Sequence, residues 1–117
     1  MGFIGKRNRQ SSVNELRRFY ELFLKWKYRS RCCIRNIEEM EGLAALVKDF
    51  RGFLEGIGLK YKSRLDYEFH YLCDALIYLD PERLGIGLSL LTARMWEILQ
   101  DYSSQNPPTG YRIIRSR

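Results

Sequence analysis

Apolar residues recur at helical spacing in four separate stretches of this chain, and this periodicity constrains the fold more than any other feature. Intervals of three and four residues place the apolar side chains of each stretch on one face of an α-helix. Short segments rich in glycine, proline or polar residues separate the stretches. The sequence shows no internal repeat and no strand pattern, except that residues 111–117 are either a loose tail or a short strand-like clip. We therefore expect an all-α protein, a compact bundle of about four helices.

The first helix is expected to run from about residue 13 to about residue 30. Ser12-Val13-Asn14-Glu15 has the pattern of a capping box, in which the serine closes the first turn and the glutamate reaches back to it. The apolar stripe that follows contains Val13, Leu16, Phe19, Tyr20, Phe23 and Trp26.

A second helix is expected from Asn36, its predicted cap, to the glycines at 56 and 58. Gly42 and Gly52 fall inside it and weaken its continuity by about 1 kcal/mol each. The sequence does not firmly place the break between the first and second helices. The alternative is that the two helices are nearly continuous.

A third helix is expected to begin at Ser63, and Asp80-Pro81 marks the start of the fourth. Asp80 suits a helix cap and Pro81 suits the first helical position. Gly85 and Gly87 weaken the first turns of this last helix, which places its firm beginning near Leu88. The polar, proline-containing sequence after Tyr102 predicts its end.

The chain has 117 residues, which suits a single domain. We expect this helical domain to occupy residues 12–102. Residues 1–11, with Lys6, Arg7 and Arg9, are predicted to form a flexible basic arm. Residues 103–117 are predicted to form an irregular basic tail.

Basic residues outnumber acidic ones by twenty to fourteen, a net charge of +6. Arginine outnumbers lysine by fourteen to six, and residues 1–35 alone carry ten basic and two acidic side chains. The planar guanidinium group binds phosphate and carboxylate bidentately and stacks on aromatic rings. This charge favours a partner that is either nucleic acid or an acidic protein surface.

The densest basic stretch extends from Lys25 to Arg35, and no acidic residue occurs between Glu21 and Glu38. Clustered cations gain affinity for phosphate backbones by releasing counterions, and interleaved aromatic residues stack on unpaired bases. A second basic cluster lies between the second and third helices. The predicted nucleic-acid-binding residues are Arg17, Arg18, Lys25, Trp26, Lys27, Tyr28, Arg29, Arg31, Arg35, Lys60, Lys62 and Arg64.

A structural explanation stands beside this prediction, because Trp26 also has the spacing of a core residue relative to Phe19 and Phe23. Whether Trp26 faces the core or the solvent separates the two interpretations. The sequence contains no zinc-finger spacing, glycine-rich clamp loop or RNP motif, so binding to RNA or DNA is expected to be backbone-led and weakly sequence-selective.

The alternative function is that of a protein–protein adaptor or accessory factor. Eight Tyr, six Phe and two Trp exceed what one small core requires, and surplus Tyr, Trp and Arg are typical of interfaces. Tyr67, Tyr71 and Tyr78 flank the third helix and suit a protein partner or a homo-oligomer. In its arginine bias and scattered cysteines the chain resembles small viral accessory proteins.

Catalytic and metal-binding patterns are not found in the sequence. His70 is the only histidine, and Cys32 and Cys33 are adjacent instead of having Cys-x-x-Cys spacing. Cys73 falls on a predicted buried face, where cysteine acts as a small apolar residue. We expect no enzymatic activity, no metal and no cofactor.

The sequence also predicts a cytoplasmic or nuclear protein. Three cysteines, two of them adjacent, do not form a disulfide framework. The N-terminus has no apolar signal segment, and the uncharged run between Arg83 and Arg94 is too short to span a bilayer. Lys6 stands where the myristoylation pattern requires Ser or Thr.

Overall fold

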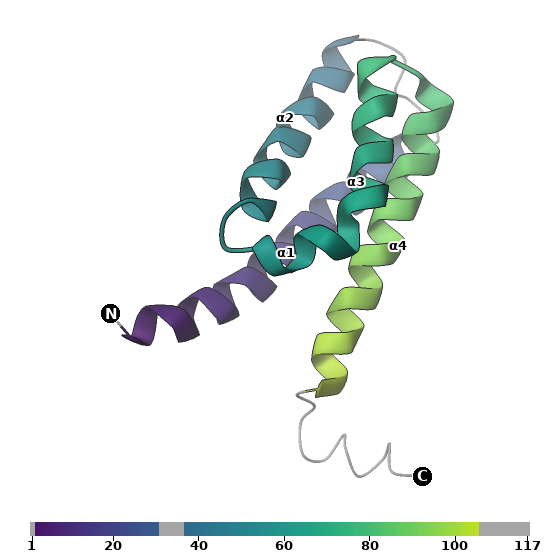
Figure 1. The fold of residues 1–117 in the computed structure, drawn as a ribbon. Helices are drawn as coiled ribbons and strands as arrows, with labels where there is room; N and C mark the ends of the chain where they lie inside the picture. The colour runs from purple at the N-terminus through teal and green to yellow at the C-terminus, as the bar shows by residue number, and fades with distance from the viewer. Residues whose placement is uncertain (1, 31–36, 106–117) are drawn as a thin grey trace, which may run out of the picture.

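Four α-helices and one short 3-10 helix form the part of the chain that the computed structural model describes, residues 2–30 and 37–105 (Figure 1). Side chains are described for residues 12–29 and 40–102. The elements are α1 (Gly2–Ser30), α2 (Ile37–Leu54), η1 (Leu59–Tyr61), α3 (Lys62–Ile77) and α4 (Pro81–Gln105). The described residues contain no strand, which confirms the predicted all-α bundle.

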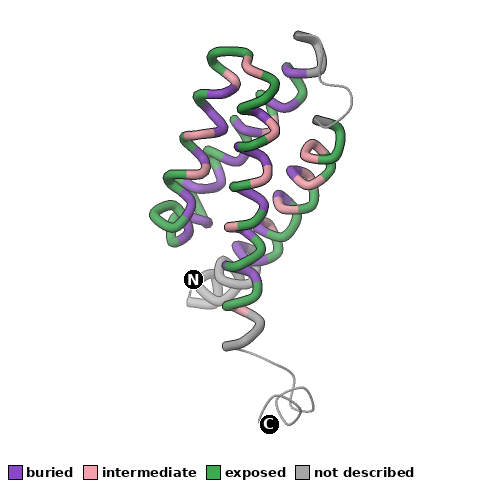
Figure 2. The backbone as a smooth tube through the Cα atoms, turned by 90° about the vertical axis from the view of Figure 1, so that its right-hand side faces the viewer, coloured by how far each residue is buried: buried purple, intermediate pink, exposed green. Residues whose placement is uncertain are grey.

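The central helix of the bundle is α4, which packs along both α1 and α3. Its inward face buries Leu84, Leu88, Leu91 and Met95 completely. These residues follow one another at intervals of three and four, so the apolar stripe read in the sequence becomes the buried stripe of the helix. Figure 2 shows the buried residues on the facing sides of the helices and the exposed ones on the outside.

A cluster of phenylalanines attaches α2 to the rest of the bundle. The ring of Phe50 lies 5.0 Å from that of Phe19, 5.2 Å from Phe23 and 5.6 Å from Phe69, measured between centroids. Phe50 is completely buried. The cluster therefore joins α1, α2 and α3 through one aromatic residue, with edge-to-face contacts that are favourable for such rings.

The beginning of α1 differs from the sequence prediction. The helix starts at Gly2, and the predicted arm of residues 1–11 is helical from residue 2 onward. Ser12 lies inside the helix, is 1% exposed, and its hydroxyl is 3.4 Å from that of Tyr61. Glu15 forms an ion pair with Arg18. The capping-box prediction was wrong because burial against η1, which is a tertiary contact, gives Ser12 its position.

The beginning of α4 confirms one prediction and corrects another. The Asp80 carboxylate accepts hydrogen bonds from the backbone N–H groups of Glu82 and Arg83, and Pro81 is the first helical residue. The helix therefore begins at Pro81 and not near Leu88. Gly87 serves close packing, because a Cβ there would lie 3.1 Å from the Leu72 Cα of α3.

The remaining boundaries are close to those predicted, apart from the end of α4 and from the predicted cap Asn36, which lies outside the described residues. The second helix closes at Leu54 before the predicted glycines, and neither Gly42 nor Gly52 interrupts it. The third begins at Lys62. The fourth continues past Tyr102 to Gln105, and residues 106–117 of the predicted tail lie outside the described residues.

The turn between α3 and α4 contains Leu79 with a φ of 52°. The N–H of Asp80 donates to the carbonyl of Ala75, and the N–H of Leu79 donates to that of Leu76. This pair of bonds is a Schellman motif, in which the left-handed position is usually glycine. A leucine there is strained, because its Cβ approaches the backbone.

Leu79→Gly is expected to be about 1 kcal/mol more stable than Leu79→Ala. Glycine relieves the left-handed strain, whereas alanine removes the half-exposed side chain but keeps the strain. Urea unfolding followed by circular dichroism measures the difference. Equal stability of the two variants would show that the backbone at Leu79 is not strained.

Candidate nucleic-acid interface

The solvent-facing side of α1 presents Arg18, Lys25 and Arg29 in one stripe. Their spacing of seven and four residues returns to the same side of a helix, and all three are exposed. Arg17 and Tyr28 lie beside this stripe and are also exposed, Tyr28 by 58%. The structure thus brings five of the predicted binding residues to the outward side of one helix.

Trp26 packs against the core and is half-buried. Its ring lies against α2 at Gly42, where an added Cβ would be 3.0 Å from the ring atom Cζ2. The guanidinium of Arg29 lies over the same ring, 4.7 Å from its centroid. Trp26 therefore holds α1 against α2 and supports Arg29, and its structural interpretation is the one that the packing favours.

Arg18 is engaged within the protein. Its Nε and Nη2 donate to the two carboxylate oxygens of Glu15 at 3.0 and 3.2 Å. These hydrogen bonds raise the pKa of the Arg18 guanidinium. The same group lies 4.7 Å from the centroid of the Phe19 ring. With its charge matched by a carboxylate, Arg18 attracts phosphate less than Arg17 and Lys25, for which no acidic partner occurs among the described residues.

Lys27 points in a different direction from the other cations of α1. It is half-buried and lines a shallow cavity at the beginning of α4, together with Pro81, Glu82 and Ile86. Arg31 and Arg35, which complete the predicted basic stretch, lie outside the described residues.

The second predicted cluster lies around η1 and the start of α3. Arg64 forms an ion pair with Asp101 of α4, with 2.7 Å between Nη2 and Oδ2. Lys60 lies over the Tyr61 ring at 5.1 Å. Lys62 is exposed and lines a cavity with Glu55 and Asp66. Carboxylates therefore accompany two of the three cations of this cluster.

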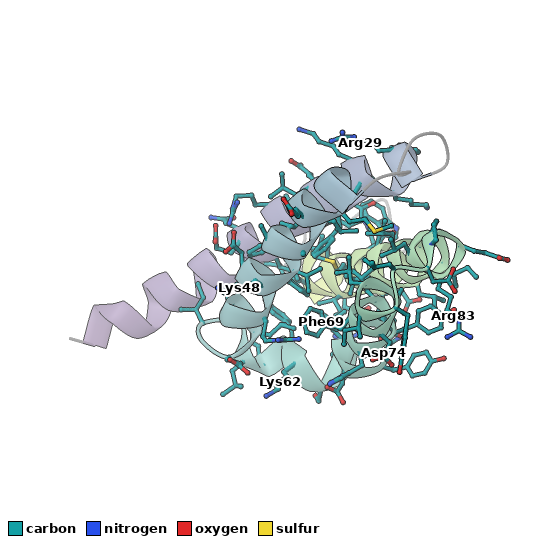
Figure 3. The ribbon with its side chains drawn as sticks, turned by 90° about the horizontal axis from the view of Figure 1, so that it is seen from above. Arg29, Lys48, Lys62, Phe69, Asp74 and Arg83 are labelled. Atoms are coloured by element: carbon teal, nitrogen blue, oxygen red, sulfur yellow. The ribbon has the colours of Figure 1, made fainter. Side chains whose placement is uncertain are left out.

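The two basic clusters do not form one surface. The Ser12–Tyr61 contact places η1 beside the early part of α1, and Arg29 lies about 25 Å further along that helix. Arg29 and Lys62 appear on opposite sides of the bundle in Figure 3. A ligand that contacts both clusters must therefore be extended.

The helical domain has no net charge. Residues 12–102 contain fourteen basic and fourteen acidic side chains. The whole excess of +6 comes from Lys6, Arg7 and Arg9 before the domain and from Arg112, Arg115 and Arg117 after it. The strongest electrostatic attraction for an anionic polymer thus comes from the two terminal segments, with the exposed stripe of α1 as a local addition.

His70 and Cys73 do not share a site. His70 is exposed, and its Nδ1 lies 2.8 Å from the backbone oxygen and 3.2 Å from a carboxylate oxygen of Asp66. Cys73 is buried, and burial raises the pKa of its thiol. Cys32 and Cys33 lie outside the described residues, and the described ones contain no group of His, Cys, Asp and Glu suited to a metal.

A groove between α2 and α3 is a feature that the sequence analysis missed. Ala44, Val47, Leu76 and Ile77 line it, together with Arg51. Val47 and Leu76 have the helical spacing of core residues, and this spacing contains no sign that the two helices leave a gap. Only the relative placement of α2 and α3 shows it.

Comparisons with known proteins give no relative for this chain. No family model, no curated protein and no solved structure matches it. Within residues 2–30 and 37–105, no helix has the length and apolar character needed to cross a membrane.

Proposed function

We propose that this protein binds nucleic acid, RNA or DNA, without catalysing a reaction, and that it contacts mainly the phosphate backbone. The distribution of charge carries this proposal. Residues 12–102 have no net charge, and the segments before and after them together carry the entire net charge of +6. Cations concentrated in this way gain binding free energy when they displace the counterions condensed on a polyanion.

The exposed stripe of α1 supports the same proposal. Lys25 and Arg17 have no acidic partner among the described residues, so their charges are available to phosphates. Arg29 is held on the Trp26 ring, which limits the side-chain entropy it loses on binding. Tyr28 is the exposed aromatic residue of this surface and the one we expect to stack on unpaired bases.

The test measures affinity for single- and double-stranded RNA and DNA of about 20 nucleotides across a salt series. If all six terminal cations contact duplex DNA, they contribute about −5 to the slope with which log K falls with log salt. The triple variant K6Q/R7Q/R9Q is expected to reduce that slope by about 3. Absence of binding at low salt would exclude the proposal.

A matched pair of double variants locates the contribution of α1. K25Q/R29Q removes two cations from the stripe and is expected to reduce the slope by about 2. K48Q/R83Q removes the same charge from α2 and α4 and is expected to leave the slope unchanged. Equal effects of the two variants would mean that net charge, and not the α1 surface, determines binding.

A second candidate function is that of a protein adaptor, which the tyrosines of α3 favour. Tyr67 and Tyr78 are 69% and 72% exposed, and Tyr67 lies 6.4 Å from the half-buried Tyr71 between ring centroids. Tyr67 belongs to α3 and Tyr78 is its C-cap residue, and exposed aromatic side chains are typical of interfaces. A stoichiometric protein complex or homo-oligomer that persists after nuclease treatment, and that Tyr67→Ala with Tyr78→Ala disrupts, would support this function.

A further inference from the structure

Two cavities lie between α2 and α3 and share Arg51 in their lining, and together they are called the groove. The upper cavity, toward the C-terminal end of α3, has a volume of about 350 Å³ and is lined by Ala44, Val47, Cys73, Leu76 and Ile77. A second cavity of about 250 Å³ continues it toward Leu54 and Phe69, and Arg51 lines both. Ile77 is 71% exposed, so the apolar lining of the upper cavity reaches the solvent.

The charged side chains of the upper cavity are both positive. Lys48 and Arg51 line it, and no acidic side chain does. The lower cavity is mixed, because Glu55 and Asp66 accompany Lys62 there. The upper cavity therefore combines an apolar floor with a cationic rim, and this combination selects a ligand that has apolar side chains and carboxylates together.

Arg51 is positioned for such a carboxylate. Its guanidinium lies 5.6 Å from the centroid of the Phe69 ring, and its Nη2 donates to the Cys73 sulfur at 3.4 Å. Phe69 lies between α2 and α3 (Figure 3). Within the described part of the chain Arg51 has no carboxylate partner. A guanidinium has five N–H donors, so most of the donors of Arg51 remain for a ligand.

We infer that the groove between α2 and α3 binds an acidic amphipathic helix of another protein. The floor is formed by two helices whose lining residues are three and four positions apart, the geometry in which a third helix inserts its apolar side chains. The terminal segments of this chain are poor occupants. They carry only cations, which Lys48 and Arg51 repel, since all fourteen acidic residues lie between residues 12 and 102.

The experiment uses two synthetic helical peptides with the same leucines at i, i+4, i+7 and i+11. One carries glutamate at the flanking positions and the other carries lysine. Fluorescence anisotropy gives the affinity of the full chain for each, and amide chemical shifts map the contact. We expect the glutamate peptide to bind with shifts at Ala44, Val47, Leu76 and Ile77, and the lysine peptide to bind at least about tenfold more weakly.

Two variants test the site. Arg51→Gln keeps most of the side chain. It is expected to weaken binding of the glutamate peptide about tenfold, because a charge-assisted hydrogen bond is lost. Ile77→Glu places an acid on the rim at an exposed position that folding tolerates, and it is expected to weaken the peptide at least as much. Ile86→Glu, an exposed isoleucine on α4, is the matched control and should leave binding unchanged.

The inference would be overturned by equal affinity for the two peptides, by chemical shifts confined to α1 and α4, or by absence of binding by the glutamate peptide up to about 1 mM. The chain could instead self-associate through the groove, in which case Ile77→Glu would abolish the association and the peptide would not compete with it. That result would assign the groove to a second copy of the chain and would also overturn the inference.

Discussion

Phe50→Ala is expected to lower the free energy of unfolding by about 3–5 kcal/mol, the largest effect of any substitution considered for this protein. The Phe50 ring is completely buried and contacts the rings of Phe19, Phe23, Phe53 and Phe69. Its removal leaves a cavity at the point where α1, α2 and α3 meet. Those neighbouring rings are themselves packed in the core, so they fill the space only in part.

Chemical denaturation followed by circular dichroism measures this loss. Phe50→Leu retains most of the buried volume and is expected to cost less than about 1.5 kcal/mol. Tyr67→Ala removes an aromatic ring of similar size from the exposed side of α3 and is expected to change stability by less than about 0.5 kcal/mol. Similar losses for Phe50→Ala and Tyr67→Ala would contradict the position of Phe50 in the core.

Gly58→Ala is expected to destabilise the protein by about 1–3 kcal/mol, and Gly52→Ala to stabilise it by about 1 kcal/mol. A Cβ on Gly58 would lie 2.4 Å from the Phe53 ring, which cannot move away because it is packed against Phe19, Phe50 and Tyr61. The backbone of Gly58, with φ −94° and ψ 17°, is accessible to alanine, so the clash alone causes the loss.

Gly52 is the matched control for Gly58, because the two substitutions add the same methyl group. Gly52 lies in the interior of α2, and a Cβ there would meet nothing within 4 Å. Alanine then gains its helix propensity without a steric cost. Thermal or urea unfolding of the two variants should therefore give shifts of opposite sign. A loss of stability in both would indicate that the space beside Gly52 is occupied.

The net positive charge and the exposed apolar groove lie on different parts of the protein. The net charge belongs to the terminal segments, with a local addition on α1, whereas the groove with its exposed isoleucine lies between α2 and α3. The proposed binding of nucleic acid and the inferred binding of an acidic helix therefore use separate surfaces. K25Q/R29Q should affect the first and Arg51→Gln the second.

Local features allowed the sequence by itself to determine the helices and several of their ends. Apolar periodicity predicted all four helices, since each buries one side and the spacing of that side is a property of the helix alone. Asp80-Pro81 predicted the start of α4 correctly, because its hydrogen bonds join residues only two and three positions apart. The sequence also located the basic stretch that begins at Lys25, whereas the stripe formed by Arg18, Lys25 and Arg29 became apparent only in the structure.

Contacts between distant residues decided the rest, and only the tertiary structure supplies them. Ser12 resembles a helix cap but is buried against Tyr61, and Trp26 resembles a stacking residue but packs on Gly42. The two basic clusters look alike in sequence, but one lies on α1 and the other around η1 and the start of α3, on the opposite side of the bundle from Arg29 (Figure 3). The groove at Arg51 depends on how α2 and α3 are placed against each other. Helical spacing fixes which side chains share a face, whereas the packing of one helix on another determines which faces meet.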